Sequence, residues 1–426
     1  MKHPKKRAAP IALLGAFALV LSACSSGSTP SSGGGAAAGG LGGRGPITYV
    51  QGKDNSNVVR PMIAVWNKAH PKENVTFKEQ TDNANQQHDD LVQNLTAKNP
   101  NYDVMDVDVI WTAEFAAKGW LQPLTGTMKV DTAPMLPATV KASTYNKVLY
   151  AAPQSSDGGI LYYRSDLVKT PPKTWAEMMG MCKIAKAEKI GCYAGQFAKY
   201  EGLTVNVAEA INSMGGTIIG ADGKPTLSTP QAKEGLQNLA GAYANGNIPK
   251  EAITFQEEQG RQAFEGGKLL FLRNWPYAYN LIKTDGSSKV RSTFGMAPLP
   301  GKDGPGASSL GGHNAAISTY SKQKATAIDF LKFLTSEDQQ RGFASRGSLA
   351  PVLTSLYDDP VLVKKLPYLT VLKTSIEHAV ARPVTPFYPA VSKAIQDNSY
   401  AAVKGEKPVE TALSDMQKAI ESAGAQ

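Results

Sequence analysis

Short apolar segments alternate with segments of helical spacing over most of the chain. Met62, Val65 and Trp66 recur at the spacing of one helix face. Apolar or alternating runs predict strands at residues 47–50, 75–79, 104–111, 148–152, 160–163, 269–272, 294–300 and 315–318. Strands that alternate with helices in this way indicate an α/β protein with mainly parallel sheets.

Polar residues and prolines mark where several helices begin. Asn57 is placed to cap the helix that carries Trp66. Thr174 and Glu177 form a capping-box pattern, and Thr229 precedes a proline suited to a first helical position. These signals predict helices immediately after Asn57, Thr174 and Thr229.

The segment 269–279 places two aromatic side chains at the end of a buried strand. Its apolar residues predict the strand, and Asn274 can cap a following helix whose first turn holds Pro276. Trp275 and Tyr277 therefore lie where a strand passes into a helix, and in an open α/β sheet this end faces the ligand crevice. Flat rings there suit the apolar face of a sugar. The alternative is that both rings simply pack between helix and sheet.

Residues 1–23 are expected to be a signal peptide rather than part of the fold. An apolar run over 11–21, too short to span a membrane comfortably, follows a basic head made of Lys2, Lys5, Lys6 and Arg7. The run ends in Leu-Ser-Ala-Cys, which resembles the bacterial lipobox and implies lipidation of Cys24; the alternative is an ordinary secretion signal. Residues 24–45, almost wholly Gly, Ser, Ala, Thr and Pro, are expected to form a flexible tether.

Charge and length constrain the class of protein. The formal net charge is +9, but the signal segment supplies much of it and no basic run follows, so we expect no nucleic-acid interface. The body is longer than one core usually supports, which predicts two lobes. Residues 46–153 with 298–346 would form the first lobe, and 154–297 with 347–426 the second. The chain would cross near 153–160 and return near 294–300.

Two cysteines remain besides Cys24. Cys182 and Cys192 lie at the end of one predicted helix and in the strand after it. Outside the cytoplasm such a pair is expected to form a disulfide that closes a short loop and contributes about 2–4 kcal/mol. The histidines are few and scattered, so no metal site is expected.

Polar residues at strand ends indicate a ligand site. We expect the crevice to be faced by Asp108, Asp157, Glu201, Asn314 and Arg382. Carboxylates and an arginine can hold sugar hydroxyls by charge-assisted hydrogen bonds. Two carboxylates at a suitable distance could instead hydrolyse a glycoside. Asp106 is assigned to an edge or solvated turn, and His313 to a loop.

These assignments have structural alternatives. An Asp before glycines, such as Asp157, is typical of a turn, Glu201 could simply start a helix, and Arg382 could lie in a surface loop. The chain has no P-loop, dinucleotide fingerprint, nucleophile elbow or HExxH motif. No cofactor is therefore expected, and other enzyme classes have no support.

Taken in order, several segments resemble the solute-binding lipoproteins of carbohydrate ABC importers, a family that includes maltose- and trehalose-binding proteins. No single segment is decisive, but together they cover essentially the whole body. They are DVIWTAEFA (108–116), DGGILYYR (157–164), PKTW (172–175), YEGL (200–203), RNWPY (273–277), Gly311-Gly312 with Asn314, and RPV (382–384).

The resemblance implies a two-lobe, periplasmic-binding-protein-like fold with hinge segments and a cleft that closes on sugar. It implies acceptors of sugar hydroxyls at Asp108, Asp157 and Glu201, stacking at Trp275 and Tyr277, and a donor at Arg382. Further sugar contacts are expected at Asn55, Gly312 and Asn314. It also supports the Cys182–Cys192 disulfide. Two positions depart from many relatives: Ser155-Ser156 replaces a bulky group before the hinge acid, and His313 replaces a bulky or aliphatic residue.

We therefore expect a lipid-anchored, extracytoplasmic, monomeric binding protein that performs no catalysis. Its expected partners are a small neutral oligosaccharide, such as trehalose or maltose, and the membrane permease subunits of an ABC importer. The alternatives are a secreted glycoside hydrolase and a protein that binds another sugar, a polyol or a glycerol phosphodiester. Few basic groups in the predicted crevice argue against the phosphodiester.

Overall fold

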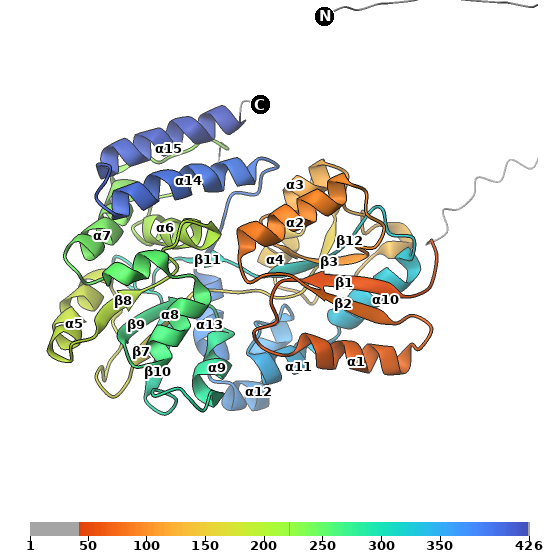
Figure 1. Ribbon diagram of the computed structural model, residues 1–426, viewed down its shortest axis with the longest axis horizontal. Helices are drawn as coiled ribbons and strands as arrows, with labels where there is room; N and C mark the ends of the chain where they lie inside the picture. The colour runs from red at the N-terminus through yellow and green to blue at the C-terminus, as the bar shows by residue number, and fades with distance from the viewer. Residues whose placement is uncertain (1–41, 221, 425–426) are drawn as a thin grey trace, which may run out of the picture. The chain divides into compact units, whose positions relative to one another are not determined.

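The computed structural model describes residues 42–220 and 222–424, whose longer strands form two sheets (Figure 1). The first sheet has the order β2-β1-β3-β12-β6 and contains β1 (Ile47–Gln51), β2 (Val75–Glu79), β3 (Val104–Asp108), β6 (Ala151–Pro153) and β12 (His313–Ile317). The second has the order β10-β7-β9-β8 and contains β7 (Ile160–Arg164), β8 (Gly191–Ala194), β9 (Leu269–Asn274) and β10 (Phe294–Pro298). Each sheet and its helices form one lobe, which confirms the predicted two-lobe α/β fold.

The helices divide between the lobes. With the first sheet go α1 (Val59–Ala69), α2 (Ala84–Thr96), α3 (Thr112–Ala117), η1 (Gly126–Met128), α4 (Pro137–Ala142), the hairpin β4 (Thr144–Tyr145) and β5 (Val148–Leu149), α10 (Lys324–Leu334) and α11 (Glu337–Gly347). With the second go α5 (Trp175–Ala187), α6 (Glu201–Ser213), α7 (Pro230–Ala244), η2 (Lys250–Thr254), α8 (Glu257–Glu265), α9 (Ala278–Thr284), η3 (Thr354–Tyr357), α12 (Pro360–Lys365), α13 (Tyr368–Glu377), α14 (Tyr388–Val403) and α15 (Val409–Gly424). Among these described residues, no helix combines the length and the apolar character needed to cross a membrane.

Helix starts follow two of the predicted signals and depart from two others, at Asn57 and at Asn274. The capping box of Thr174 and Glu177 opens α5, and Thr229 caps α7. At α1 the cap is Asp54 rather than Asn57, because the Asp54 carboxylate accepts the backbone N–H groups of Val58 (3.1 Å) and Val59 (2.8 Å). Asn57 instead has φ 54° and forms the turn that precedes the helix.

Both sheets are mixed, whereas the sequence predicted mainly parallel ones. β1 is parallel to β2 and β3, but β12 is antiparallel to β3 and to β6. In the second sheet, β7 is antiparallel to β9 and β10, and β8 is parallel to β9. The prediction was wrong because it treated every strand as part of a strand–helix repeat. β12 and β7 instead flank segments that pass between the lobes, and each runs opposite to the other strands of its sheet.

The chain passes to the second lobe between β6 and β7 and returns after the segment 294–300, where the sequence placed the return. The loop after β10 still packs on the second lobe, because Gly301 pairs with Thr174 and the Lys302 N–H donates to the Ser213 carbonyl (3.1 Å). The return runs through β11 (Ser308–Leu310), which pairs in parallel with β13 (Ala379–Ala381). Residues 298–307 therefore pack with the second lobe rather than the first.

Residues 42–45 belong to the folded body, although their composition predicted a tether. Arg44 forms ion pairs with Glu73 (3.0 Å) and Asp329 (2.7 Å), and the Gly45 N–H donates to Thr326 Oγ1 (3.1 Å). Two acidic partners hold this segment despite its glycines. The predicted signal peptide, Cys24 and the tether as far as residue 41 lie outside the described residues.

The predicted disulfide is present. Cys182 and Cys192 are bonded, with a Cα–Cα distance of 5.2 Å. The bond joins α5 to β8, which is an edge strand of the second sheet. It therefore fastens an element that has a hydrogen-bonded neighbour strand on only one side.

Candidate ligand-binding cleft

A cavity lies between the lobes and is lined by residues of both. The first lobe contributes the loop after β1, the start of α2 and the ends of β3 and β12. The second lobe contributes the starts of α6 and α8 and the turn after β9. The cavity volume is about 220 Å3. Since one water needs ~10–15 Å3 of such volume, this space suits a compact ligand of one or two rings rather than a polymer.

The turn after β9 presents two aromatic side chains to the cavity. All six residues of β9 are buried, which fixes the strand end. Asn274 Oδ1 accepts the Trp275 N–H (2.8 Å), and the Tyr162 hydroxyl donates to the Trp275 carbonyl (3.0 Å). Trp275 and Tyr277 are half-buried and line the cavity, and α9 begins only after them. The predicted strand-to-helix transition is thus present, but Asn274 does not cap the helix, because its side chain bonds the adjacent Trp275 N–H. Pro276 lies before α9 rather than in its first turn.

Arg273 stacks its guanidinium against one face of the Trp275 ring. Its guanidinium carbon lies 3.8 Å from the centre of the indole, so one ring face is covered by a cation. The fully buried guanidinium pairs with both Glu209 carboxylate oxygens (2.8 and 2.5 Å) and with Gln196 (3.0 Å). A ligand can therefore stack only on the opposite face. The sequence shows Arg273 two positions before Trp275 but does not reveal its partner Glu209, which lies on α6.

Asp157 lies beside this ring, in the segment that joins the lobes. A side chain at Gly311 would meet both the Trp275 ring (2.9 Å) and the Asp157 Cβ (3.2 Å), so Gly311 allows the two to approach closely. No described side chain donates a hydrogen bond to the Asp157 carboxylate. Burial raises the pKa of Asp157 to about 6, although the positive charge of His313 opposes this rise.

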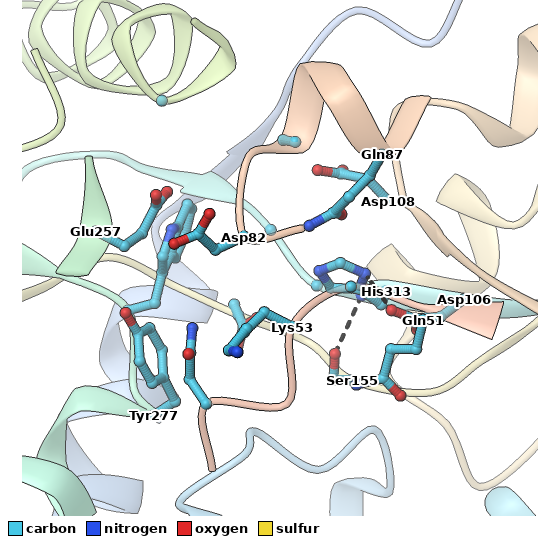
Figure 2. A pocket seen from close by; sticks show the side chains of 18 of the residues that line it. Gln51, Lys53, Asp82, Gln87, Asp106, Asp108, Ser155, Glu257, Tyr277 and His313 are labelled. Atoms are coloured by element: carbon cyan, nitrogen blue, oxygen red, sulfur yellow. Dashed lines mark hydrogen bonds and ion pairs between the residues drawn. The ribbon is translucent and has the colours of Figure 1, made fainter. Parts of the chain in front are cut away.

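His313 and Asp106, both labelled in Figure 2, form an ion pair in the lining of the cavity. His313 Nδ1 lies 2.8 Å from Asp106 Oδ2, and the ring is about one-third exposed. Burial disfavours the imidazolium, but Asp106, and beyond it Asp108 and Asp157, raise the pKa of His313 to about 9. At neutral pH the ring is thus a charged donor whose second nitrogen remains available.

Arg382 joins carboxylates of both lobes. Its guanidinium bonds Glu201 (2.6 Å) in the second lobe and Asp108 (3.2 Å) in the first. Glu201 also accepts hydrogen bonds from the hydroxyls of Tyr388 (2.6 Å) and Ser392. Burial raises the pKa of Glu201 in spite of these partners. The pKa of Arg382 is raised above its ordinary value by Asp108 and Glu201, against the opposing effect of burial.

The structure places most of the predicted site residues on the cavity. They are Asn55, Asp108, Asp157, Glu201, Trp275, Tyr277, Gly312 and Arg382. Asn55 is half-buried in the loop after β1. Gly312 has φ +109°, and a Cβ there would lie 2.2 Å from the Ser155 carbonyl oxygen, so this turn requires glycine.

Asn314 is the exception and does not line the cavity. Its side chain is fully buried and bonds Ser143 Oγ (2.9 Å) and Thr112 Oγ1 (3.1 Å). Successive strand side chains point to opposite faces, so His313 faces the cavity and Asn314 does not. The assignment of His313 to a loop was also wrong, because it is the first residue of β12.

Asp106 was likewise misplaced by the sequence. It is buried in β3, a strand with neighbours on both sides, rather than at an edge or a turn. Asp106 and Asp108 are two positions apart and therefore share a face of the strand. That alternation was the signal that could have assigned both carboxylates to the cavity.

Further lining residues were not predicted and make the cavity acidic. Glu257 and Glu258 begin α8, where their side chains accept hydrogen bonds from the hydroxyls of Tyr200 (2.6 Å) and Tyr277 (2.7 Å). Figure 2 shows Lys53 and Asp82 within the same cavity. The lining contains eight carboxylates but only Lys53, His313 and Arg382 as cationic groups. Among the described residues no group of histidine, cysteine and acidic side chains has the arrangement of a metal site.

Comparison with known proteins assigns this chain to a family. Residues 51–341 match the family of bacterial extracellular solute-binding proteins. A probable ABC transporter-binding protein of Deinococcus radiodurans is 36% identical over 307 residues, which cover 69% of this chain and 72% of that protein. A mannitol-binding protein of Pseudomonas aeruginosa is 22% identical over 86% of this chain and 90% of its own length.

A solved structure with the same fold is the maltose-bound MalE3 of T. maritima. It is 32% identical to this chain, with a TM-score of 0.84, and the match covers 88% of this chain and 99% of that one. The family match and the Deinococcus relative each span more than half of the sequence. The chain therefore belongs to the family of bacterial extracellular solute-binding proteins.

Proposed function

We propose that this protein captures a small neutral oligosaccharide, an α-linked glucose disaccharide such as trehalose or maltose, for an ABC importer. The observation that carries the proposal is the Trp275 ring beside Asp157. One face of the indole is covered by Arg273, the half-buried ring lines the cavity, and the neighbouring carboxylate accepts no hydrogen bond from a described side chain. A sugar ring offers an apolar face and hydroxyl donors, which match these two groups.

The charge of the cavity supports a neutral ligand. Eight carboxylates against three cationic side chains would repel a phosphate or another anion. Hydroxyl donors, in contrast, can use these acceptors without bringing charge into the cleft. The maltose in the MalE3 relative supports the same class of ligand, and the mannitol-binding relative makes polyols the nearest alternative.

We propose that no bond of the ligand is broken. A glycosidase needs two carboxylates free to act as acid and base or nucleophile. Here Glu201 and Asp108 are held by Arg382, and Asp106 is paired with His313. Two lining carboxylates, Asp82 and Asp157, accept no hydrogen bond from a described residue, and Asp82 is exposed. Asp157 is therefore the single carboxylate of this kind that is at least half-buried, and one carboxylate cannot fill both roles.

Closure of the lobes would be the signal that the permease detects. A ligand stabilises the closed form only to the extent that it contacts both lobes in that form. Asn55 and His313 belong to the first lobe, Trp275 and Tyr277 to the second, and Asp157 to the segment between them. A ligand held by these groups would favour closure through contacts on each side.

The location follows from the family and from the first residues. We propose that the protein acts as a monomer outside the cytoplasm, anchored to the membrane by a lipid on Cys24. The resemblance of residues 21–24 to a lipobox supports the anchor. Metabolic labelling with a palmitate analogue, compared between the parent and Cys24→Ser, tests it; equal labelling of both would contradict the proposal.

Isothermal titration calorimetry over a ligand panel tests the function. The panel contains trehalose, maltose, mannitol and a glycerol phosphodiester, with a parallel assay for product release from the two disaccharides. Binding of a disaccharide without hydrolysis is expected. Trp275→Ala should remove most of the binding, whereas Trp175→Phe, outside the cleft on α5, should leave it unchanged. Equal binding by Trp275→Ala and the parent would show that the site is elsewhere.

A further inference from the structure

A second cavity adjoins the ligand cleft. Ala84 and Glu201 line both cavities and therefore lie between them. The second cavity has a volume of about 330 Å3 and is bounded by parts of α2, α6 and α14. Its lining combines the indole of Trp111 and the ring of Pro389 with the polar side chains of Asn85, Asp89, Lys393 and Gln396. It has the mixture of flat apolar and polar groups that lines the cleft.

The wall between the cavities, here called the partition, contains Glu201 and is stabilised by a network of buried polar groups. Glu201 is its centre and bonds Arg382, Tyr388 and Ser392, all of which are buried. The Glu201 backbone N–H donates to Asn85 Oδ1 (3.2 Å), which closes the partition from the side of the first lobe. Arg382 then connects the network to Asp108. Both Glu201 oxygens are occupied by protein donors, so this carboxylate has little capacity left for a ligand.

We propose that Glu201 and Arg382 limit the length of the ligand, because together they close the end of the cleft that leads to the second cavity. This inference rests on the proposed sugar-binding function. A third or fourth sugar unit directed toward α14 would have to displace Glu201 from its buried partners. Breaking a buried ion pair costs more than the exposed hydroxyl contacts of an added sugar return. The parent should therefore accept a disaccharide and reject its extensions.

The test is isothermal titration calorimetry of the full-length protein with sugars of increasing length. Maltose, maltotriose and maltotetraose form one series, and trehalose and glucosyl-trehalose form a second. For the parent, affinity should fall by ~10-fold or more when the disaccharide is extended, which is the range expected for one strong contact. Glu201→Ala shortens the shared wall while Arg382 keeps its bond to Asp108. It should reduce this discrimination by ~10-fold.

Two further variants make the result decisive. Arg382→Ala removes the other residue of the proposed wall. It should lower the ratio of the affinity for the disaccharide to that for its extended forms, as Glu201→Ala should. Val205→Ala is the matched control, because Val205 lines the cleft but not the second cavity. It should leave the discrimination between short and long ligands unchanged. Circular dichroism of each variant verifies folding.

Each outcome decides one of the two proposals. If the parent binds maltotetraose as tightly as maltose, or if folded Glu201→Ala retains the parental discrimination, the partition does not limit length. The measurements on the parent alone give this answer if neither wall variant folds. If the parent binds no saccharide at all, the sugar-binding proposal itself is wrong, and the role of the partition in ligand length falls with it.

Discussion

Two groups of side chains in the cleft, here called the paired end (Asp108, Glu201 and Arg382) and the open end (Trp275 and Asp157), are similar in kind but are used in opposite ways. At the paired end, the charges of Asp108, Glu201 and Arg382 are bonded to one another across the lobes. At the open end, the Asp157 carboxylate accepts no hydrogen bond from a described side chain. Both ends bury carboxylates, and burial raises the pKa of both Glu201 and Asp157.

The difference indicates which polar groups are reserved for a ligand. A buried charge that already has its partners stabilises a fixed geometry, and removing one partner leaves the other uncompensated. A buried charge without partners destabilises the empty protein and gains its partners only when a ligand arrives. Variants at the two ends should therefore change stability in opposite directions.

The largest effect is expected at the paired end. Arg382→Met keeps much of the side-chain volume but leaves Asp108 and Glu201 without their shared cation, so the free energy of unfolding should fall by about 3–5 kcal/mol. Urea denaturation followed by circular dichroism measures it. Lys393→Met is the control, because its ion pair with Asp397 is three-quarters exposed on the lysine side and should contribute less than ~1 kcal/mol. Equal losses in both variants would contradict the comparison.

At the open end the largest loss should be in affinity. Trp275→Ala removes the half-exposed indole, and a central aromatic contact of this kind is typically worth about 2–4 kcal/mol. The dissociation constant for the preferred disaccharide should therefore rise ~100-fold or more. Trp275→Phe should recover part of the loss, because a smaller flat ring remains over Arg273. A full loss in Trp275→Phe would indicate that the indole N–H, rather than the ring face, makes the contact.

Asp157→Asn should separate binding from stability. Loss of a charged acceptor should weaken ligand binding by about 1.5–3 kcal/mol. The folded-state pKa of Asp157 is raised to about 6 from an ordinary value of 3.8, so its ionisation costs stability as the pH rises through 6. At pH 8 the variant should thus unfold with a free energy greater by on the order of 1–2 kcal/mol, and the gain should vanish below about pH 4. Urea titrations at both pH values measure this, and a less stable variant at pH 8 would contradict it.

Local sequence patterns predicted the fold well where one element sufficed. The run 269–272 followed by Asn274 and Trp275 correctly gave a buried strand end with aromatic side chains at the crevice. The capping pair Thr174 and Glu177 is equally local and was equally correct. The direction of each strand in the sheets was not predicted correctly. It depends on which segments cross between the lobes, and the residue types within a strand do not indicate this.

The errors in the site have a similar cause. The pair Gly311-Gly312 drew attention to Asn314, but the strand begins at His313 and a shift of one position exchanges the two faces. Asp106 was excluded because a charge in an apolar strand suggested an edge, whereas its partner His313 lies on the neighbouring strand. Glu209 beneath Arg273 was missed for the same reason. Partners that are distant in sequence decide whether a charge is structural or available to a ligand.

The smallest effect expected is a pH window for binding. Asp157 loses its charge as the pH falls below about 6, and His313, whose pKa is raised to about 9 chiefly by Asp106, loses its charge above that value. If the ligand uses the ionised Asp157, affinity at pH 5 should be ~10-fold weaker than at pH 7, since one unit below a pKa leaves about a tenth of the group ionised.

Calorimetry from pH 5 to pH 10 gives the profile, and the variants assign its two limbs. The loss of affinity at acidic pH should disappear in Asp157→Asn, which has no carboxylate to titrate at this position. It should persist in His313→Gln, because burial and the charges of Asp106, Asp108 and Arg273 still act on the pKa of Asp157. The loss of affinity at alkaline pH should disappear in His313→Gln and persist in Asp157→Asn. If both limbs survive in both variants, the titrating groups belong to the paired end of the cleft. In that case the distinction between bonded and available charges does not govern ligand binding.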